Sequence, residues 1–98
     1  MMYELRYMKP AEKYFKKIKE KGLKDAFKTA LTNIAGNPYC GEAKQGDLSG
    51  VYCYDVYYNR TNYEIAYQII EEEGKLIVVI MAGTRENFYD ELKRYFNK

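Results

Sequence analysis

The stretch Leu76–Met81 constrains the fold of this 98-residue chain most strongly, because all of its residues are apolar. A strand that is apolar at every position has both faces covered, so this one is predicted to lie inside a sheet. The predicted strand covers Leu76–Met81 and stops where Ala82–Thr84 begins, and a helix over about Glu86–Phe96 closes the chain. The inner stripe of this helix is predicted to consist of Phe88, Leu92, Tyr95 and Phe96. Arg85 and Tyr89 are then expected at the exit of the most buried strand.

Two amphipathic helices are predicted ahead of this strand. The first starts near Pro10, which suits a first helical turn, and Gly22 is predicted to end it. The second starts near Leu23, and the short link between the two predicts an antiparallel pair. Apolar residues recur with helical spacing, at Ala11, Tyr14, Phe15 and Ile18 in the first helix and at Leu23, Ala26, Phe27, Ala30, Leu31 and Ile34 in the second.

Three further segments alternate as strands do, namely Tyr3–Tyr7, Val51–Tyr58 and Tyr63–Ile70. The last two are joined by a predicted turn over Asn59–Asn62. Gly36–Gly50 is predicted to be a loop because of its Gly and Pro content. The fold class is therefore α+β, in the order β-α-α-β-β-β-α, with a helical hairpin packed on a small, mostly antiparallel sheet. A chain of this length is expected to form a single domain, residues 1–98.

The composition limits the chemistry that is open to the chain. It has no histidine and only two cysteines, Cys40 and Cys53, which suit neither a disulfide framework nor a zinc knuckle. We therefore expect no metal and no cofactor, and catalysis falls to Glu, Asp, Lys, Arg or Tyr. The net charge of +2 says little about partners. Since no apolar run suits a membrane span or a secretion signal, we expect a cytoplasmic protein without a membrane partner.

Two motifs, taken with the order of elements, resemble the RelE/ParE superfamily of toxins from bacterial type II toxin–antitoxin modules. One is "KQGDLSG" at Lys44–Gly50, directly before a predicted strand. The other is "AGTRENFYDELKRY" at Ala82–Tyr95, after the last predicted strand. Between them lies a predicted pair of strands, and the second strand of this pair contains "YEIAY" at Tyr63–Tyr67. The motifs are moderately specific together, and the resemblance covers nearly the whole chain.

The resemblance implies a toxin that a cognate antitoxin silences, in a hetero-oligomer of the two. In the ribonuclease branch of the superfamily, toxins cut messenger RNA in the ribosomal A site without a metal and so inhibit translation. The RNA 2′-hydroxyl attacks the neighbouring phosphate, and the enzyme supplies a proton acceptor, a proton donor and positive charge. We therefore expect an RNA-binding, ribosome-dependent endoribonuclease, that is, an mRNA interferase.

The same resemblance gives the candidate site residues. Arg85 is expected to stabilise charge on the phosphate, a task that suits a guanidinium. Tyr89 is expected to stack on a base or to aid proton transfer, and either Glu42 or Asp55 to act as the base. Contacts to RNA are expected from Lys44, Tyr54 and Tyr57.

Three positions depart from the nuclease pattern. Relatives carry basic residues roughly where this chain has Cys53 and Asp55, and an arginine where it has Glu64. Carboxylates at these positions reduce the attraction for RNA. They leave open an alternative function, either a ParE-like inhibitor of DNA gyrase or a toxin fold that binds without nuclease activity. An unrelated structural or adaptor domain is a third alternative.

Structural roles compete for the same residues. Thr84 is a plausible N-cap of the last helix, and Glu86 suits its first turn. Tyr89 lies beside Phe88, where it is also suited to packing. Tyrosines on strands are more often packed or paired across strands than bound to bases.

Overall fold

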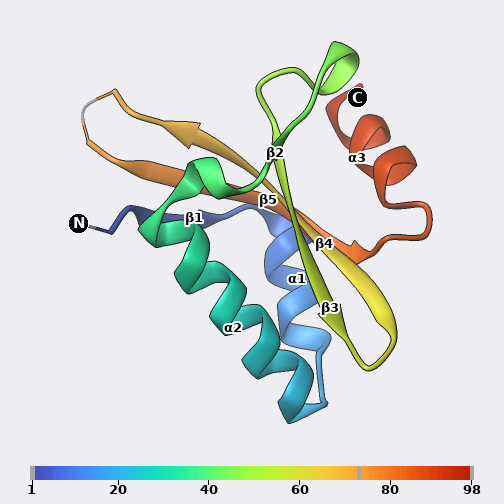
Figure 1. Ribbon diagram of the computed structural model, residues 1–98. Helices are drawn as coiled ribbons and strands as arrows, with labels where there is room; N and C mark the ends of the chain where they lie inside the picture. Colours follow the sequence, from blue (N-terminus) through green and yellow to red (C-terminus); the bar gives the residue numbers. More distant parts are fainter. Residues whose placement is uncertain (1, 73, 98) are drawn as a thin grey trace.

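The computed structural model describes residues 2–72 and 74–97, and a five-stranded sheet forms its middle layer (Figure 1). Across the sheet the strands lie in the order β1 (Glu4–Tyr7), β5 (Leu76–Thr84), β4 (Thr61–Ile70), β3 (Tyr52–Tyr58) and β2 (Glu42–Ala43). β1 runs parallel to β5, and the other neighbours are antiparallel. This arrangement confirms the mostly antiparallel sheet.

Helices cover both faces of the sheet (Figure 1). α1 (Lys9–Lys17) and α2 (Lys21–Gly36) form the predicted hairpin on one face, and α3 (Phe88–Phe96) lies on the other. Each face has its own apolar cluster. The hairpin core consists of Ala11, Ile18, Leu23, Phe27, Ala30, Ile34, Val56, Ile65, Tyr67, Ile77, Val79 and Ala82, and the α3 core of Leu48, Val51, Cys53, Ala66, Ile80, Phe88 and Leu92.

β5 lies inside the sheet, as its apolar run predicts, because it pairs with β1 on one side and with β4 on the other. Ile77 and Val79 turn to the hairpin core, whereas Ile80 turns to the α3 core. The register between β4 and β5 shifts by an irregularity at Ala66 and Tyr67. The apolar run of β5 therefore has an apolar cluster on each side of it.

The end of β5 differs from the sequence-based prediction. The strand continues to Thr84, which pairs with Tyr63 of β4. Thr84 is therefore not the N-cap of the last helix, and Glu86 lies before that helix and not in its first turn. Asn87, with φ 61° in the left-handed region that Asn tolerates, precedes the first helical residue, Phe88.

α3 buries a narrower stripe than the sequence predicts. Phe88 and Leu92 are buried in the α3 core, and Tyr95 packs against its margin. Phe96 is 40% exposed, so its assignment to the inner stripe is wrong. The helix rests on the sheet through its first turns, and its last turn reaches past the cluster.

The link between the helices also differs from the prediction. α1 ends at Lys17, and Gly22 lies in the first turn of α2 instead of ending α1. A Cβ atom at Gly22 would lie 2.2 Å from the hydroxyl of Tyr58. Tyr58 Oη in turn donates a 2.7 Å hydrogen bond to Glu20. The glycine is therefore explained by the close approach of a side chain and not by a helix stop.

The β3–β4 hairpin turns more tightly than predicted. Asn59 and Arg60 alone form the turn, with φ of 50° and 64°, which suits a type I′ turn. Thr61 and Asn62, which were predicted in the turn, already belong to β4.

The predicted loop Gly36–Gly50 contains short elements of its own. Two 3-10 turns, Pro38–Cys40 and Gly46–Leu48, flank β2. β2 pairs with β3, with Glu42 opposite Cys53. The backbone of this segment is thereby fixed to the edge of the sheet, and Glu42 with it.

The structure also addresses two expectations from composition. Both cysteines are free, as predicted, with Cys40 exposed and Cys53 buried. In residues 2–72 and 74–97, no helix is long and apolar enough to cross a membrane.

Candidate functional site

A buried carboxylate lies on the α3 side of the sheet. Glu64 of β4 is only 1% exposed, and in the sheet register it lies between Asp55 of β3 and Gly83 of β5. Its neighbour Ile65 belongs to the hairpin core, so the alternation along a strand turns Glu64 to the opposite side. Burial of a carboxylate is unfavourable unless other groups satisfy it. An apolar side chain would suit this position better if packing were its only role.

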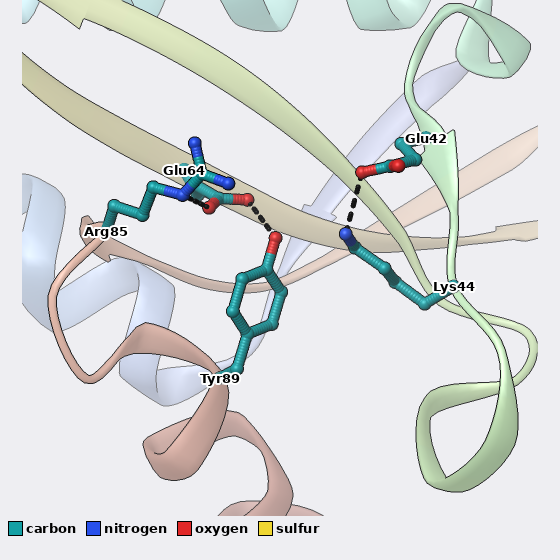
Figure 2. Close-up of polar contacts among 5 residues, drawn as sticks. All are labelled: Glu42, Lys44, Glu64, Arg85 and Tyr89. Carbon is teal, nitrogen blue, oxygen red and sulfur yellow. Dashed lines mark hydrogen bonds and ion pairs between the residues drawn. The ribbon is translucent and has the colours of Figure 1, made fainter.

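Tyr89 and Arg85, which follow β5, both contact Glu64 (Figure 2). Tyr89 Oη, in the first turn of α3, donates a 2.6 Å hydrogen bond to Glu64 Oε1. Arg85 Nε lies 3.5 Å from Glu64 Oε2. No hydrogen bond to Oε2 is found among the described residues, so the ion pair with Arg85 is its main compensation. The Arg85 side chain is 60% exposed, which leaves much of its guanidinium open to solvent.

Lys44 and Glu42 form a second pair beside the first (Figure 2). Lys44 Nζ donates a 2.7 Å hydrogen bond to Glu42 Oε1. The same ammonium lies 4.7 Å from the centre of the Tyr89 ring, within range of a cation–π contact. Lys44 is mostly buried, whereas Glu42 is 76% exposed. Through Lys44, the segment after β2 joins the network around Tyr89.

The surroundings set the protonation of this network. Burial, and then the hydrogen bond to Glu64, raises the pKa of Tyr89 to about 12, so the phenol is neutral near neutral pH. Burial lowers the pKa of Lys44, but hydrogen bonds to Glu42 and Tyr89 outweigh it, and the net shift is upward. The hydrogen bond from Lys44 lowers the pKa of Glu42. Burial and the nearby Glu64 raise the pKa of Cys53 to about 12, which keeps its thiol neutral.

Two other predicted site residues lie on β3, on the same side of the sheet as this network. Asp55 is exposed and lies opposite Glu64 in the register. Tyr57 is 67% exposed, so its ring is open to solvent. With these two, the α3 side of the sheet brings together most of the predicted site, since four other candidates, Arg85, Tyr89, Glu42 and Lys44, already form the network above.

Tyr54 is the predicted residue that does not join the others. It packs against the hairpin core, on the opposite face of the sheet. Its hydroxyl accepts a 3.2 Å hydrogen bond from Asn33 Nδ2 of α2. The structure therefore does not group Tyr54 with the other candidates, because residue 54 alternates away from Asp55 and toward the helices.

Glu64 is the residue of this site that the sequence did not predict. In the sequence it stood out only as a departure from the nuclease pattern. The usable signal was an acidic residue inside the otherwise apolar and aromatic strand "YEIAY". A charged residue in such a strand is uncommon unless it is paired. Its partners follow it by more than twenty residues along the chain, so spacing alone did not identify them. In the described part of the chain, no three Cys, Asp or Glu side chains are grouped to hold a metal ion.

This chain is similar to known proteins in sequence and in fold. The family model described as "ParE-like toxin of type II bacterial toxin-antitoxin system" matches residues 5–93. A protein of Escherichia coli that is described as a RelE-like toxin is 29% identical over 86 residues, which cover 88% of this chain and 86% of that protein.

Solved structures show the same fold. The free E. coli toxin RelE, in a variant with two arginines changed to alanine, superimposes with a TM-score of 0.73 at 22% identity, over 95% of this chain and 94% of that one. The toxin–antitoxin complex RelBE2 of Mycobacterium tuberculosis gives a TM-score of 0.66 at 20% identity, over 87% of this chain and 100% of that one. The RelE variant bound to an antitoxin RelB peptide gives 0.67 at 21% identity, over 94% and 95%. The chain therefore belongs to the RelE/ParE superfamily, as a ParE-like toxin of a bacterial type II toxin–antitoxin system.

Proposed function

We propose that this toxin is a metal-independent, ribosome-dependent endonuclease that cuts messenger RNA and so inhibits translation. The observation that carries the proposal is the network on the α3 side of the sheet. It places a guanidinium, an ammonium and a neutral phenol beside two carboxylates. These are the kinds of group that attack by a 2′-hydroxyl on a phosphate requires.

Arg85 is the proposed phosphate ligand. Its ion pair with Glu64 uses Nε, and the side chain is 60% exposed. A guanidinium has five donors in a fixed plane, so one edge can bind Glu64 while another binds a phosphate. This arrangement would hold positive charge ready before the phosphate arrives.

Lys44 is the second proposed cation, and it binds Glu42 at present. Because Glu42 is 76% exposed, exchange of this carboxylate for an RNA phosphate requires little rearrangement of the fold. Tyr57, which is largely exposed on the same side, is proposed to stack on a base.

The proton acceptor in this proposal is a carboxylate, since the chain has no histidine. Glu42 and Asp55 are the two that the sequence suggests. The hydrogen bond from Lys44 lowers the pKa of Glu42, which keeps it ionised but makes it a weaker base. Asp55 is exposed on β3, opposite Glu64.

A cognate antitoxin is the proposed regulatory partner. Two of the similar structures are named as toxin bound to antitoxin or to an antitoxin peptide, so the fold is known in that kind of complex. We propose that this chain forms a hetero-oligomer with its own antitoxin and acts on ribosomes in the cytoplasm.

Primer extension on mRNA from a translation reaction tests the proposal. Purified toxin should produce discrete cuts in the ribosomal A site, and Arg85→Ala should remove them. Loss of a preorganised group that stabilises transition-state charge typically reduces the rate by about 100- to 1,000-fold.

Arg6→Ala is the matched control, because Arg6 also pairs with a carboxylate through Nε, at Glu4 on β1. It should cut as the unchanged toxin does. Intact mRNA at high toxin concentration would overturn the proposal. Inhibition of DNA gyrase supercoiling would then favour the ParE-like alternative, and inactivity in both assays a binding module.

A further inference from the structure

We propose that Glu64 is the final acceptor of the 2′-hydroxyl proton, which reaches it through the hydroxyl of Tyr89. The inference rests on the proposed endonuclease function and deepens it. It assigns the base role to neither Glu42 nor Asp55. Glu64 acts through Tyr89 and is a positioning and relay residue, whereas Tyr89 is the residue that would touch RNA.

The geometry gives the relay its direction. Tyr89 Oη already donates a 2.6 Å hydrogen bond to Glu64 Oε1. Glu64 is 1% exposed, while Tyr89 is partly exposed. A substrate hydroxyl that reaches this side of the sheet can therefore contact Tyr89 but not the carboxylate behind it. In the proposed path, the proton that Glu64 takes from the substrate passes through the phenol.

Packing alone does not explain a carboxylate at this position. Glu64 is the buried charged residue of β4, and its Oε2 accepts no hydrogen bond among the described residues. Replacement of a buried ion pair by apolar side chains is often neutral or stabilising. A partly satisfied buried charge is better explained by chemistry that uses it.

Tyr89 alone does not suffice as the base. Its raised pKa keeps the phenol protonated near neutral pH, so phenolate is scarce. A protonated phenol can still accept a proton if it releases its own to a second group at the same time. Glu64 Oε1, at hydrogen-bond distance, is that second group.

The proposed step forms one bond to phosphorus and breaks another. The 2′-oxygen forms a bond to phosphorus, its proton moves to Tyr89 Oη, and the phenolic proton moves to Glu64 Oε1. The bond from phosphorus to the 5′-oxygen breaks, and this oxygen takes a proton from the Lys44 ammonium. The products are a 2′,3′-cyclic phosphate and a 5′-hydroxyl, and proton exchange with water restores Glu64 and Lys44.

Arg85 couples the relay to the phosphate. While Glu64 is ionised, it holds the guanidinium through Nε at 3.5 Å. Once Glu64 is protonated, that attraction is lost, and the full charge of Arg85 is available to the negative phosphorane. Proton transfer and charge stabilisation then strengthen each other in the transition state.

The groups that face Glu64 come from every element around it. Arg85 after β5 brings a positive charge, and Asp55, opposite Glu64 on β3, brings a carboxylate. Cys53 on β3 is a neutral thiol, since burial and then Glu64 raise its pKa to about 12. Tyr89 donates from α3, and Lys44 contributes a positive charge from the segment after β2.

Single-turnover cleavage on purified ribosome–mRNA complexes, from mildly acidic to mildly alkaline pH, tests the relay. Glu64→Gln keeps the size and the hydrogen-bonding oxygen but accepts no proton. It should lower the rate by about 100-fold or more and abolish the rise in rate with pH at the acidic end. Tyr89→Phe should cause a similar loss, and the double variant should be no slower than either, because both changes interrupt one path.

The pair Tyr39 and Glu71 provides the matched control. There, too, a tyrosine hydroxyl donates to a glutamate, but at the opposite end of β4. Glu71→Gln and Tyr39→Phe should leave the rate and the pH profile unchanged. Circular dichroism and ribosome binding, measured on every variant, separate loss of chemistry from loss of structure.

The outcomes are distinguishable. If the toxin cuts and Glu64→Gln cuts at the same rate with the same pH profile, the relay is overturned and the endonuclease stands. The same holds if Glu42→Gln, and not Glu64→Gln, removes the rise with pH. If Glu64→Gln does not fold, full activity of Tyr89→Phe would overturn the relay. If the unchanged toxin does not cut, both proposals fall.

Discussion

Tyr67 and Tyr89 lie on opposite sides of one sheet and make the same kind of hydrogen bond to different acceptors. Tyr67, fully buried in the hairpin core, donates over 2.7 Å to the main-chain oxygen of Pro38. Tyr89 donates over 2.6 Å to the carboxylate of Glu64. A peptide oxygen fixes the ring, whereas a carboxylate can also take up the proton. This difference fits our proposal that the α3 side serves chemistry, while the hairpin side serves stability.

The cores on the two sides support the same division. In the hairpin core, Phe27 makes edge contacts with the rings of Tyr14, Phe15 and Tyr63. The α3 core is smaller and lies beside a buried charge. Such a charge contributes little to stability even when it is paired.

The largest effect on stability is expected in the hairpin core. Phe27→Ala leaves a cavity among three aromatic rings and should lower the free energy of unfolding by about 3–5 kcal/mol. Urea denaturation measures the change. The control Phe96→Ala, at a position that is 40% exposed on α3, should cost less than about 1 kcal/mol. Equal losses at the two positions would contradict the division.

The next largest difference in stability is expected between substitutions at Tyr67 and at Tyr89. Tyr67→Phe leaves the buried Pro38 oxygen without its donor and should cost about 1–3 kcal/mol. Tyr89→Phe removes a partly buried hydroxyl that donates to Glu64, but the ion pair with Arg85 still compensates this carboxylate, so the cost should be smaller. Urea denaturation of both variants, prepared in parallel, gives the comparison, and a larger loss for Tyr89→Phe would reverse it.

Glu64→Gln should change stability by no more than about 1 kcal/mol in either direction. The substitution gives up an ion pair, but it also removes the penalty of a buried charge, and the two effects nearly cancel. Thermal and urea denaturation check this expectation. A loss of several kcal/mol would show that Glu64 is chiefly a structural residue.

The smallest expected effect is on pH dependence. The Tyr89 pKa rises from 10.0 to about 12, so its share of stability is complete below about pH 10 and is lost as the pH rises toward 12. Carbon-13 NMR of the tyrosine ring, with Tyr89→Phe for assignment, should find this late titration. In Glu64→Gln the pKa should fall only part of the way to 10.0, because burial is the larger cause. An unchanged pKa in that variant would contradict the coupling to Glu64.

The sequence predicted the hairpin side of the fold well. In α2 the apolar residues recur with helical spacing, and in β5 they form an unbroken run. These patterns determine which faces of the two elements are buried, so they predict the packing reliably. The errors lie where a contact from a distant part of the chain outweighs the local sequence preference for a helix stop or a helix cap. Gly22 suggests a helix stop, but the hydroxyl of Tyr58 explains it. Thr84 suggests a helix cap, but strand pairing with Tyr63 extends β5 through it.

The site was predictable only in part. Arg85 and Tyr89 belong to one motif, so their proximity follows from local sequence. The role of Glu64 depends on pairing between β4 and β5, which brings residues far apart in the chain together. Tyr54 and Tyr57 look alike in sequence, and only the side of β3 to which each turns separates them.

The most direct test of the account measures stability and cleavage on the same preparations of two variants. Glu64→Gln is predicted to change stability by no more than about 1 kcal/mol. It is predicted to cut mRNA at least about 100-fold more slowly than the unchanged toxin. Phe27→Leu is predicted to lose about 1–2 kcal/mol of stability and to cut at the unchanged rate. If Glu64→Gln cuts as fast as the unchanged toxin, or loses activity only in proportion to its unfolded fraction, the α3 side does not serve chemistry through Glu64.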